Sequence, residues 1–340
     1  MNQISSMTPK IYNQQTLCVY CREQFDEKKH PQPFSDEHII PEGIGGTHVL
    51  PNAVCASCRT LTSNTYEVRT IRSTFQIPRI ILGVRRKKQR QRDKKRGSPS
   101  LPLVALGNNT VSIAEPDLAV TGRDFPQLFH LPKFDRAGFY TGIRNDDICT
   151  SFRVVLVDLG VTNKLPAGGI TVSIKIDFFE FAMTLIKMAY SYALANSLNL
   201  QTDINDIRDL ILGNRTDVFN FFGSFESDSD KTSELHTLSH SVLKSLVIVK
   251  LHLFSAYTKQ SYMVVIGKSN QGPISVSGSS KMRLPAFSGN RIALVDNAIK
   301  LNTNYDNTHV RNPNEMFRAN EIISDKMLLP KKNRILSYKS

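Results

Sequence analysis

Four of the five cysteines in this chain of 340 residues fall into two pairs with the C-x-x-C spacing of metal sites. Cys18 and Cys21 form the first pair, Cys55 and Cys58 form the second, and Cys149 stands apart. Each pair can supply two thiolates from one tight turn, and four thiolates fill the tetrahedral shell of a structural zinc ion. Because the first ten residues lack the apolar core of a signal peptide, we expect reduced thiols and a metal site. Ordinary buried thiols are the alternative, but chance seldom gives two such pairs.

The segment between the pairs carries Glu37 next to His38, followed by Pro41 and Gly43. A hydrolysis assisted by a metal ion needs an activated water and a cation that stabilises the developing charge. A neutral imidazole accepts a proton near pH 7, and a carboxylate suits a hard cation such as Mg²⁺. Neighbours on a regular strand point to opposite faces, so both side chains reach one site only if the strand is distorted, as Pro41 and Gly43 allow. A purely structural zinc knuckle would need neither group.

Residues 18–67 resemble the cysteine-containing branch of the HNH endonucleases. The resemblance lies in an Asp/Glu-His-Ile-x-Pro segment, an Asn in the turn before the second cysteine pair, and the helix expected after it. The matching residues are Glu37, His38, Pro41, Asn52, Cys55 and Cys58. The resemblance implies a small zinc-bound ββα-metal fold, similar to a treble clef. It also implies that His38 is the general base, that Glu37 binds a catalytic Mg²⁺ or Mn²⁺ ion, and that Asn52 orients His38.

One position departs from the family pattern. The family usually has Asn or His directly after the last cysteine as a further metal ligand, and here that residue is Arg59, which cannot bind a cation. On an α-helix that starts near Cys58, Ser63 and then Glu67 follow Arg59 at steps of about 40°, whereas Asn64 lies about 140° away. We therefore expect Glu67 to complete the cation site; a water ligand or a degenerate site are the alternatives.

The positive charge of the chain is concentrated in one run. The net charge is +13, and Arg85–Arg96 holds nine basic residues and one Asp. Such a run can neutralise phosphates without regard to sequence, although a solvated linker has the same composition. We expect a nucleic-acid partner, DNA more than RNA. The most apolar segment, Phe178–Leu198, is interrupted by Glu180 and Lys187, so it reads as a buried helix and not a membrane span. We expect a cytoplasmic protein.

The fold class that the pattern favours is α+β. We divide the chain into a zinc domain (residues 1–75), a basic linker (76–100) and a larger mixed α+β domain (101–340) of unknown role, such as target recognition, dimerisation or regulation. Hydrophobic spacing predicts helices at Phe178–Leu198 and Ile204–Leu212. Short runs rich in β-branched residues predict strands, and these are Gln76–Val84, Phe152–Leu159, Thr171–Ile176, Ser245–Phe254 and Ser261–Gly267.

These observations favour a metal-dependent HNH endonuclease that acts on DNA, and a homo-oligomer is compatible with them. A bacterial or mobile-element setting, including defence against foreign DNA, fits the resemblance, but the residues themselves do not indicate it. A zinc-dependent nucleic-acid-binding protein without catalysis is the first alternative, and Arg59 is the residue that favours it. A zinc-stapled protein-interaction scaffold is the second, and it predicts no salt-dependent affinity for DNA.

Overall fold

The computed structural model describes most of the zinc-domain segment and the central part of the chain. The described residues are 10–26, 28, 32–81, 111–112, 127–143, 151–158, 169–172, 174–198, 204–226, 234–243, 245–255, 258–269, 279–283, 293–300, 319–321 and 327–328. The basic run Arg85–Arg96 and Cys149 lie outside these residues. Within the described part of the chain, no helix is long and apolar enough to cross a membrane.

The N-terminal segment forms a small sheet backed by helical turns. The sheet has the order β1 (Lys10–Ile11), β3 (His48–Val54), β2 (Ser35–His38), with β2 antiparallel and β1 parallel to β3. A short 3₁₀ turn, η1 (Glu42–Ile44), lies between β2 and β3. The helical part runs through α1 (Ala56–Thr62), the π-helical turn η2 (Ser63–Glu67) and α2 (Val68–Arg72). The predicted ββα arrangement is confirmed.

The strand predicted at Gln76–Val84 is wrong, because residues Gln76–Ile81 form helix α3. Tertiary contacts override the β-branched composition there. Phe75, at the turn before α3, is fully buried against Phe181 and Phe254. Arg79 of α3 donates a hydrogen bond from Nε to the carbonyl of Gly43. These contacts hold the segment against the η1 turn as a helix.

A layer of helices follows the N-terminal layer. Helix α6 (Phe178–Ala195) begins at Asp177, whose carboxylate accepts the amide of Glu180 at 2.9 Å. Helix α7 (Ile204–Leu212) ends at Gly213, which has the left-handed φ of 81°. Both helices were predicted from the sequence and are confirmed. Two further short helices are α5 (Gly138–Thr141) and α8 (Val218–Phe221), and the rings of Phe139 and Phe221 are in contact.

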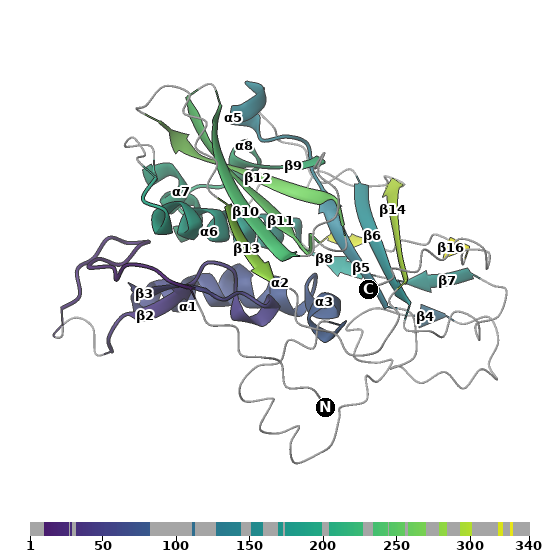
Figure 1. Cartoon of the computed structure of the whole chain (residues 1–340), viewed down its shortest axis with the longest axis horizontal. Coiled ribbons are helices and arrows are strands. Elements are labelled where there is room, and N and C mark those ends of the chain that lie inside the picture. The colour runs from purple at the N-terminus through teal and green to yellow at the C-terminus, as the bar shows by residue number, and fades with distance from the viewer. Residues whose placement is uncertain are drawn as a thin grey trace, which may run out of the picture.

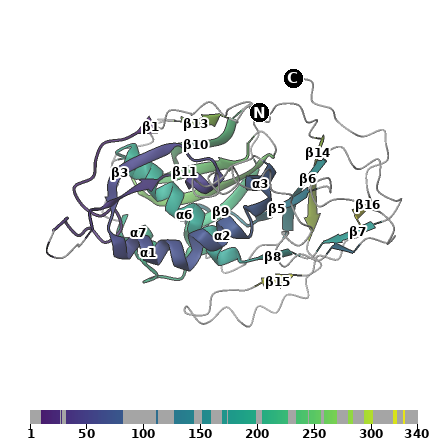
Figure 2. The same ribbon diagram turned by 90° about the horizontal axis from the view of Figure 1, so that it is seen from below.

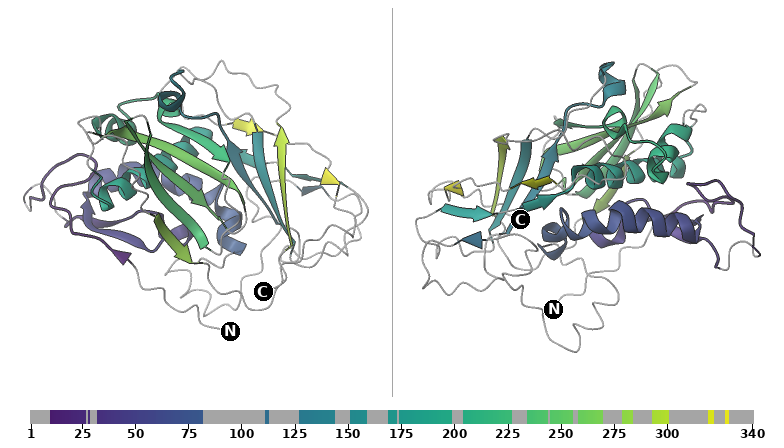
Figure 3. Two further views of the ribbon diagram at one scale, coloured as in Figure 1. Left: turned by 45° about the horizontal axis from the view of Figure 1, so that its top comes forward. Right: turned by 180° about the vertical axis from the view of Figure 1, so that it is seen from behind.

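The third layer is an antiparallel sheet of five strands. Its order is β13 (Ser279–Arg283), β10 (Glu234–Leu243), β11 (Leu246–Leu253), β12 (Gln260–Lys268), β9 (Phe222–Glu226). The predicted strands at Ser245–Phe254 and Ser261–Gly267 correspond to β11 and β12 and pair as a hairpin. Figure 1 shows α6 and α7 between this sheet and the N-terminal layer, and the view from behind in Figure 3 agrees.

Smaller sheets lie beside these layers. The first has the strand order β14 (Ala293–Lys300), β6 (Ser151–Asp158), β5 (Gln127–Lys133). The second has the order β16 (Met327–Leu328), β7 (Gly169–Val172), β4 (Val111–Ser112). The third consists of β15 (Ala319–Glu321) paired with β8 (Ile174–Ile176). The strand predicted at Phe152–Leu159 is β6. The one predicted at Thr171–Ile176 is divided between β7 and β8.

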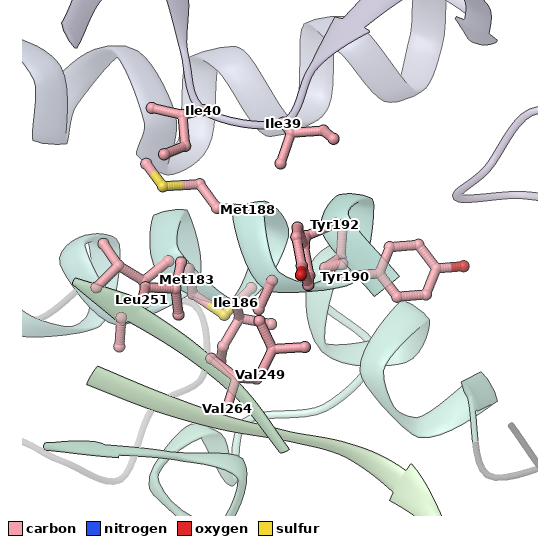
Figure 4. Close-up of a cluster of buried hydrophobic side chains, with 14 of the residues drawn as sticks. Ile39, Ile40, Met183, Ile186, Met188, Tyr190, Tyr192, Val249, Leu251 and Val264 are labelled. Carbon is pink, nitrogen blue, oxygen red and sulfur yellow. The ribbon is translucent and has the colours of Figure 1, made fainter. Parts of the chain in front are cut away.

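Helix α6 is buried on all sides, and most of its residues are apolar. In Figure 4, Met188 points to Ile40 of the N-terminal layer, whereas Met183 and Ile186 point to the sheet strands that carry Val249 and Leu251. One hydrophobic core therefore includes residues of all three layers. In Figure 2, the view from below, α1 and α2 lie in front of α6 and the sheet lies behind it.

Candidate metal centre and active site

The first cysteine pair lies in a tight turn. The amide of Cys18 donates to the carbonyl of Glu23 at 2.8 Å, and the amide of Arg22 donates to the carbonyl of Cys18 at 2.9 Å. Arg22 has a left-handed φ of 66°, which lets the chain reverse. The turn brings Cys18 and Cys21 to the same side of the backbone, so their two sulfurs can meet a single ion.

The second pair lies at the start of α1. Cys55 is the residue before the helix, and Cys58 is in its first turn. Residues three apart lie on one face of a helix, and the amide of Cys55 reaches Cys18 Sγ at 3.5 Å. The end of β3 and the start of α1 thus carry the second pair to the first.

The four sulfur atoms form one cluster. All lie within 4.8 Å of one another, and Cys21 Sγ is 3.7 Å from Cys55 Sγ. A zinc–sulfur bond of about 2.3 Å in a tetrahedron gives sulfur–sulfur edges of about 3.8 Å. A hydrogen bond from Cys58 lowers the pKa of Cys18 to about 4, whereas burial raises the pKa of Cys21 to about 12. The geometry fits zinc, whose charge would permit all four thiolates to coexist.

Two glycines shape the loop after Glu37 and His38. Gly45 has φ 93°, and its amide donates to the carbonyl of Glu42. A Cβ at Gly46 would lie 1.7 Å from the carbonyl oxygen of Ile40, so the chain can pass there only without a side chain. The loop returns to β3, where the carbonyl of His48 accepts the amide of Ile39 at 3.0 Å. It thereby fixes the end of β2, which carries the motif.

Asn52 lies in an irregular part of β3. Ser35 pairs with Val54 but Glu37 pairs with Leu50, so extra residues of β3 bulge between these pairs. Asn52 has φ 49°, and its amide donates to Asp36 Oδ1 at 3.1 Å. Asn tolerates this left-handed conformation better than most residues. The structure thus gives Asn52 a role in the backbone of the hairpin, and no hydrogen bond from its side chain to His38 occurs among the described residues.

His38 is half-buried at the end of β2. Its Nδ1 atom is buried and has no hydrogen-bond partner within the part of the chain that the structure describes. His38 pairs with Val49 and Glu37 pairs with Leu50, so the strand is regular across these two residues. The irregularity that sequence reasoning expected after the motif precedes it instead, and Glu37 and His38 point to opposite faces of the strand.

Glu37 and Glu67, the two carboxylates predicted to bind a cation, both contact the ammonium of Lys187. Lys187 Nζ of α6 is 2.6 Å from Glu37 Oε1 and also binds Glu67 Oε2. The exposed fractions of the three side chains are 7% for Lys187, 8% for Glu37 and 17% for Glu67. Two carboxylates from the N-terminal layer therefore converge on one cation, an ammonium supplied from the second half of the chain.

The ion-pair cluster is buried, and burial affects the pKa values of its groups. Burial would lower the pKa of Lys187, but the carboxylates of Glu37 and Glu67 raise it overall, so the lysine is charged. Burial raises the pKa of Glu37, and Lys187 opposes that shift. Tyr20 lies nearby, and burial raises the pKa of its hydroxyl, which therefore remains a neutral hydrogen-bonding group.

Arg59 is exposed on α1. Glu67 was predicted from the geometry of an ideal α-helix, whereas Ser63–Glu67 form a π-helical turn. A π-helical turn contains more residues than an α-helical turn and often occurs at functional sites. It brings Glu67 beside Glu37 although the helical register differs from the assumed one.

Sequence reasoning missed the partners that α6 contributes. Its residues Glu180, Thr184, Lys187 and Ser191 lie on one face, and we call them the polar stripe. Glu180 binds Arg69 at 2.8 Å, Thr184 binds Thr70 at 3.0 Å, and Ser191 lies 3.4 Å from the hydroxyl of Tyr20. The available signal was the presence of charged residues in an otherwise apolar helix, because a buried charge requires a partner.

Residues 15–73 match the model of a protein family described as HNH endonuclease. The matched segment contains both cysteine pairs and every site residue named from the sequence, so the resemblance inferred from the motif is confirmed for this part of the chain. No curated protein and no solved structure matches the chain.

Proposed function

We propose that the chain is a metal-dependent endonuclease that hydrolyses phosphodiester bonds, with DNA as the favoured substrate. The observation that carries the proposal is the coincidence of three features in one short segment. The family match covers residues 15–73, four thiols in that segment lie within 4.8 Å of one another, and Glu37–His38 lies between the two cysteine pairs. Reduced cysteines are consistent with a cytoplasmic setting.

In this proposal His38 is the general base. Its buried Nδ1 has no partner among the described residues, and its location at a strand end leaves the imidazole half-buried. A neutral imidazole in such a position can take a proton from the attacking water. Asn52 supports His38 through the bulge of β3, where its amide is bound to Asp36. The zinc cluster holds the hairpin and α1 together around this strand.

Glu37 and Glu67 are the proposed ligands of the catalytic cation. The donor set fits a hard divalent ion, because the two carboxylates already converge on one positive charge. When bound, Mg²⁺ or Mn²⁺ would stabilise the charge that develops on the phosphate. His38 and Glu37 point to opposite faces of β2. The proposal therefore requires the end of β2 to change shape when substrate and cation bind, so that both groups reach one phosphate.

The test is nicking of supercoiled plasmid by the purified full chain with Mg²⁺ or Mn²⁺. The wild-type chain should nick the plasmid, and His38→Ala should lower the rate at least about a hundredfold, as expected when a general base is removed. The variant should retain the zinc content and thermal midpoint of the wild type, which shows that the fold survives. Equal nicking by the two proteins would contradict the role of His38.

A nucleic-acid-binding protein without catalysis is the second candidate. Two observations favour it: Arg59 stands where the family usually has a ligand, and Lys187 occupies the carboxylate pair. Under this alternative the zinc-loaded chain binds DNA with a salt-dependent affinity and never nicks it. Binding without nicking over a range of plasmids and divalent ions would therefore favour this candidate.

A further inference from the structure

Both carboxylates proposed as ligands of the catalytic cation contact the ammonium of Lys187. We propose that Lys187 is an internal substitute for the divalent ion: it closes the Glu37–Glu67 site, and a divalent ion binds there only when this lysine withdraws. The inference rests on the proposed role of Glu37 and Glu67 as cation ligands. It adds a control of that site by helix α6, which lies more than a hundred residues away in the sequence.

The position of Lys187 supports a competition for the same oxygens. Its Nζ lies 2.6 Å from Glu37 Oε1 and also binds Glu67 Oε2, so one atom of the lysine contacts both proposed ligands. A divalent ion that bridges the same two carboxylates would have to lie between them, and like charges would then repel at very short range. The ammonium and the ion therefore exclude each other.

The polar stripe holds Lys187 in place on both sides. One turn before it, Thr184 binds Thr70 at 3.0 Å, and one turn after it, Ser191 faces Tyr20. The lysine side chain is 7% exposed, so it cannot turn into solvent without a movement of α6 or of the N-terminal layer. Breaking a buried ion pair leaves uncompensated charge. The closed arrangement is accordingly the resting state.

The access route runs past Glu67. This carboxylate is the most exposed of the three groups, at 17%. It lies in the π-helical turn η2, where the backbone hydrogen bonds depart from the α-helical pattern. Separation of α6 from η2 would expose both carboxylates together. Binding of nucleic acid, or of another partner that moves α6, is the kind of event that would open the site.

The primary experiment measures Mn²⁺ binding by electron paramagnetic resonance on the zinc-loaded full chain. Lys187→Met keeps an unbranched side chain that is one atom shorter and removes its charge. The matched control is the triple variant Lys187→Met, Glu37→Gln, Glu67→Gln, which lacks the carboxylates. We expect the single variant to bind one more Mn²⁺ ion than the triple variant, and to bind it at least tenfold more tightly than the wild type does. Equal affinity in wild type and single variant would overturn the inference.

A second measurement uses the wild-type chain, so it holds even if Lys187→Met fails to fold. The protons on Nζ of a buried, hydrogen-bonded ammonium exchange slowly with water, so the ¹⁵Nζ signal of such a lysine is observable. The signal that is missing from the spectrum of Lys187→Arg belongs to Lys187. As Mg²⁺ is added, this signal should remain until the carboxylate ¹³C signals of Glu37 and Glu67 shift, and should disappear together with that shift. Shifted carboxylate signals beside an unchanged Lys187 signal would refute the exchange.

Plasmid nicking by the same preparations separates this inference from the proposed function. If no preparation nicks DNA, but Lys187→Met gains the Mn²⁺ site, the nuclease proposal fails and the exchange stands. If the wild type nicks DNA, but Lys187→Met and the triple variant bind Mn²⁺ equally, the nuclease proposal stands and the exchange is refuted. The binding and NMR measurements thus decide the exchange without any reference to activity.

Discussion

His236 of β10 links the sheet to the loop that follows Glu37 and His38. Its Nε2 lies 2.8 Å from the carbonyl of Ile44, and its Nδ1 accepts the amide of Phe254 at 3.2 Å. The imidazole can satisfy both partners only as the neutral tautomer with a proton on Nε2. Burial lowers the pKa of His236 to about 4. A single ring therefore fixes the η1 turn against the third layer, provided that it stays neutral.

This arrangement predicts a pH dependence of stability. Between pH 6.5 and about 4 the unfolded chain binds a proton on His236 and the folded chain does not, so stability falls as the pH falls through that window. The contribution of the histidine amounts to about 3 kcal/mol across the window. In His236→Gln, where an amide can still donate to Ile44, the free energy of unfolding should fall less steeply.

Urea unfolding at several pH values measures the difference. The zinc thiolates and the other buried histidines titrate in both proteins, so the comparison isolates His236. Parallel curves for the wild type and His236→Gln would mean that this imidazole does not resist protonation in the folded chain.

At the scale of elements, the turn between β2 and β3 depends on one glycine. A Cβ at Gly46 would meet the Ile40 carbonyl oxygen at 1.7 Å, and the amide of Gly46 also donates to the carbonyl of Pro41. Gly46→Ala should cost about 3 kcal/mol or more, because the backbone itself must move. Gly43→Ala is the matched control, since its Cβ would approach only side chains, the nearest being Ile71 at 3.3 Å.

The measurement is the free energy of unfolding of both alanine variants, together with nicking activity. Gly43→Ala should stay within about 1 kcal/mol of the wild type. A stable Gly46→Ala protein would show that the η1 loop is looser than its contacts imply. If Gly46→Ala is destabilised but nicks DNA at the wild-type rate, the loop does not control the orientation of His38.

The elements also show which parts of the fold the sequence could predict. The cysteine pairs and helix α6 follow from local spacing, the ββα fold is what the family resemblance implies, and all are confirmed. Helix α3 could not be predicted from local spacing, because Phe75 and Arg79 contact residues in distant segments of the chain. Glu67 was named on the assumption of an ideal α-helix, and the π turn that carries it cannot be read from spacing. Lys187 was interpreted as an interruption of an apolar run, since its partners lie 120 or more residues away.

At the scale of the whole molecule, the boundary that we drew at residue 75 is crossed by a continuous core. Tyr190 of α6 donates a hydrogen bond to the carbonyl of Val19, inside the turn of the first cysteine pair, at 2.8 Å. The rings of Tyr20 and Tyr190 lie 6.1 Å apart. The cysteine cluster is thus supported from the second half of the chain, and retention of a zinc ion bound there should depend on α6.

Tyr190→Phe tests this coupling, with Tyr192→Phe as the matched control. Each change removes one buried hydroxyl at a cost of about 1 kcal/mol. Tyr190 binds the carbonyl of Val19 in the zinc turn, whereas the hydroxyl of Tyr192 faces His240 of β10. Zinc transfer to a chromophoric chelator should therefore be several-fold faster from Tyr190→Phe than from Tyr192→Phe, although both lose similar stability. Equal transfer rates from the two variants would mean that α6 packs on the zinc turn without holding it, and that the N-terminal layer retains its metal independently of the rest of the chain.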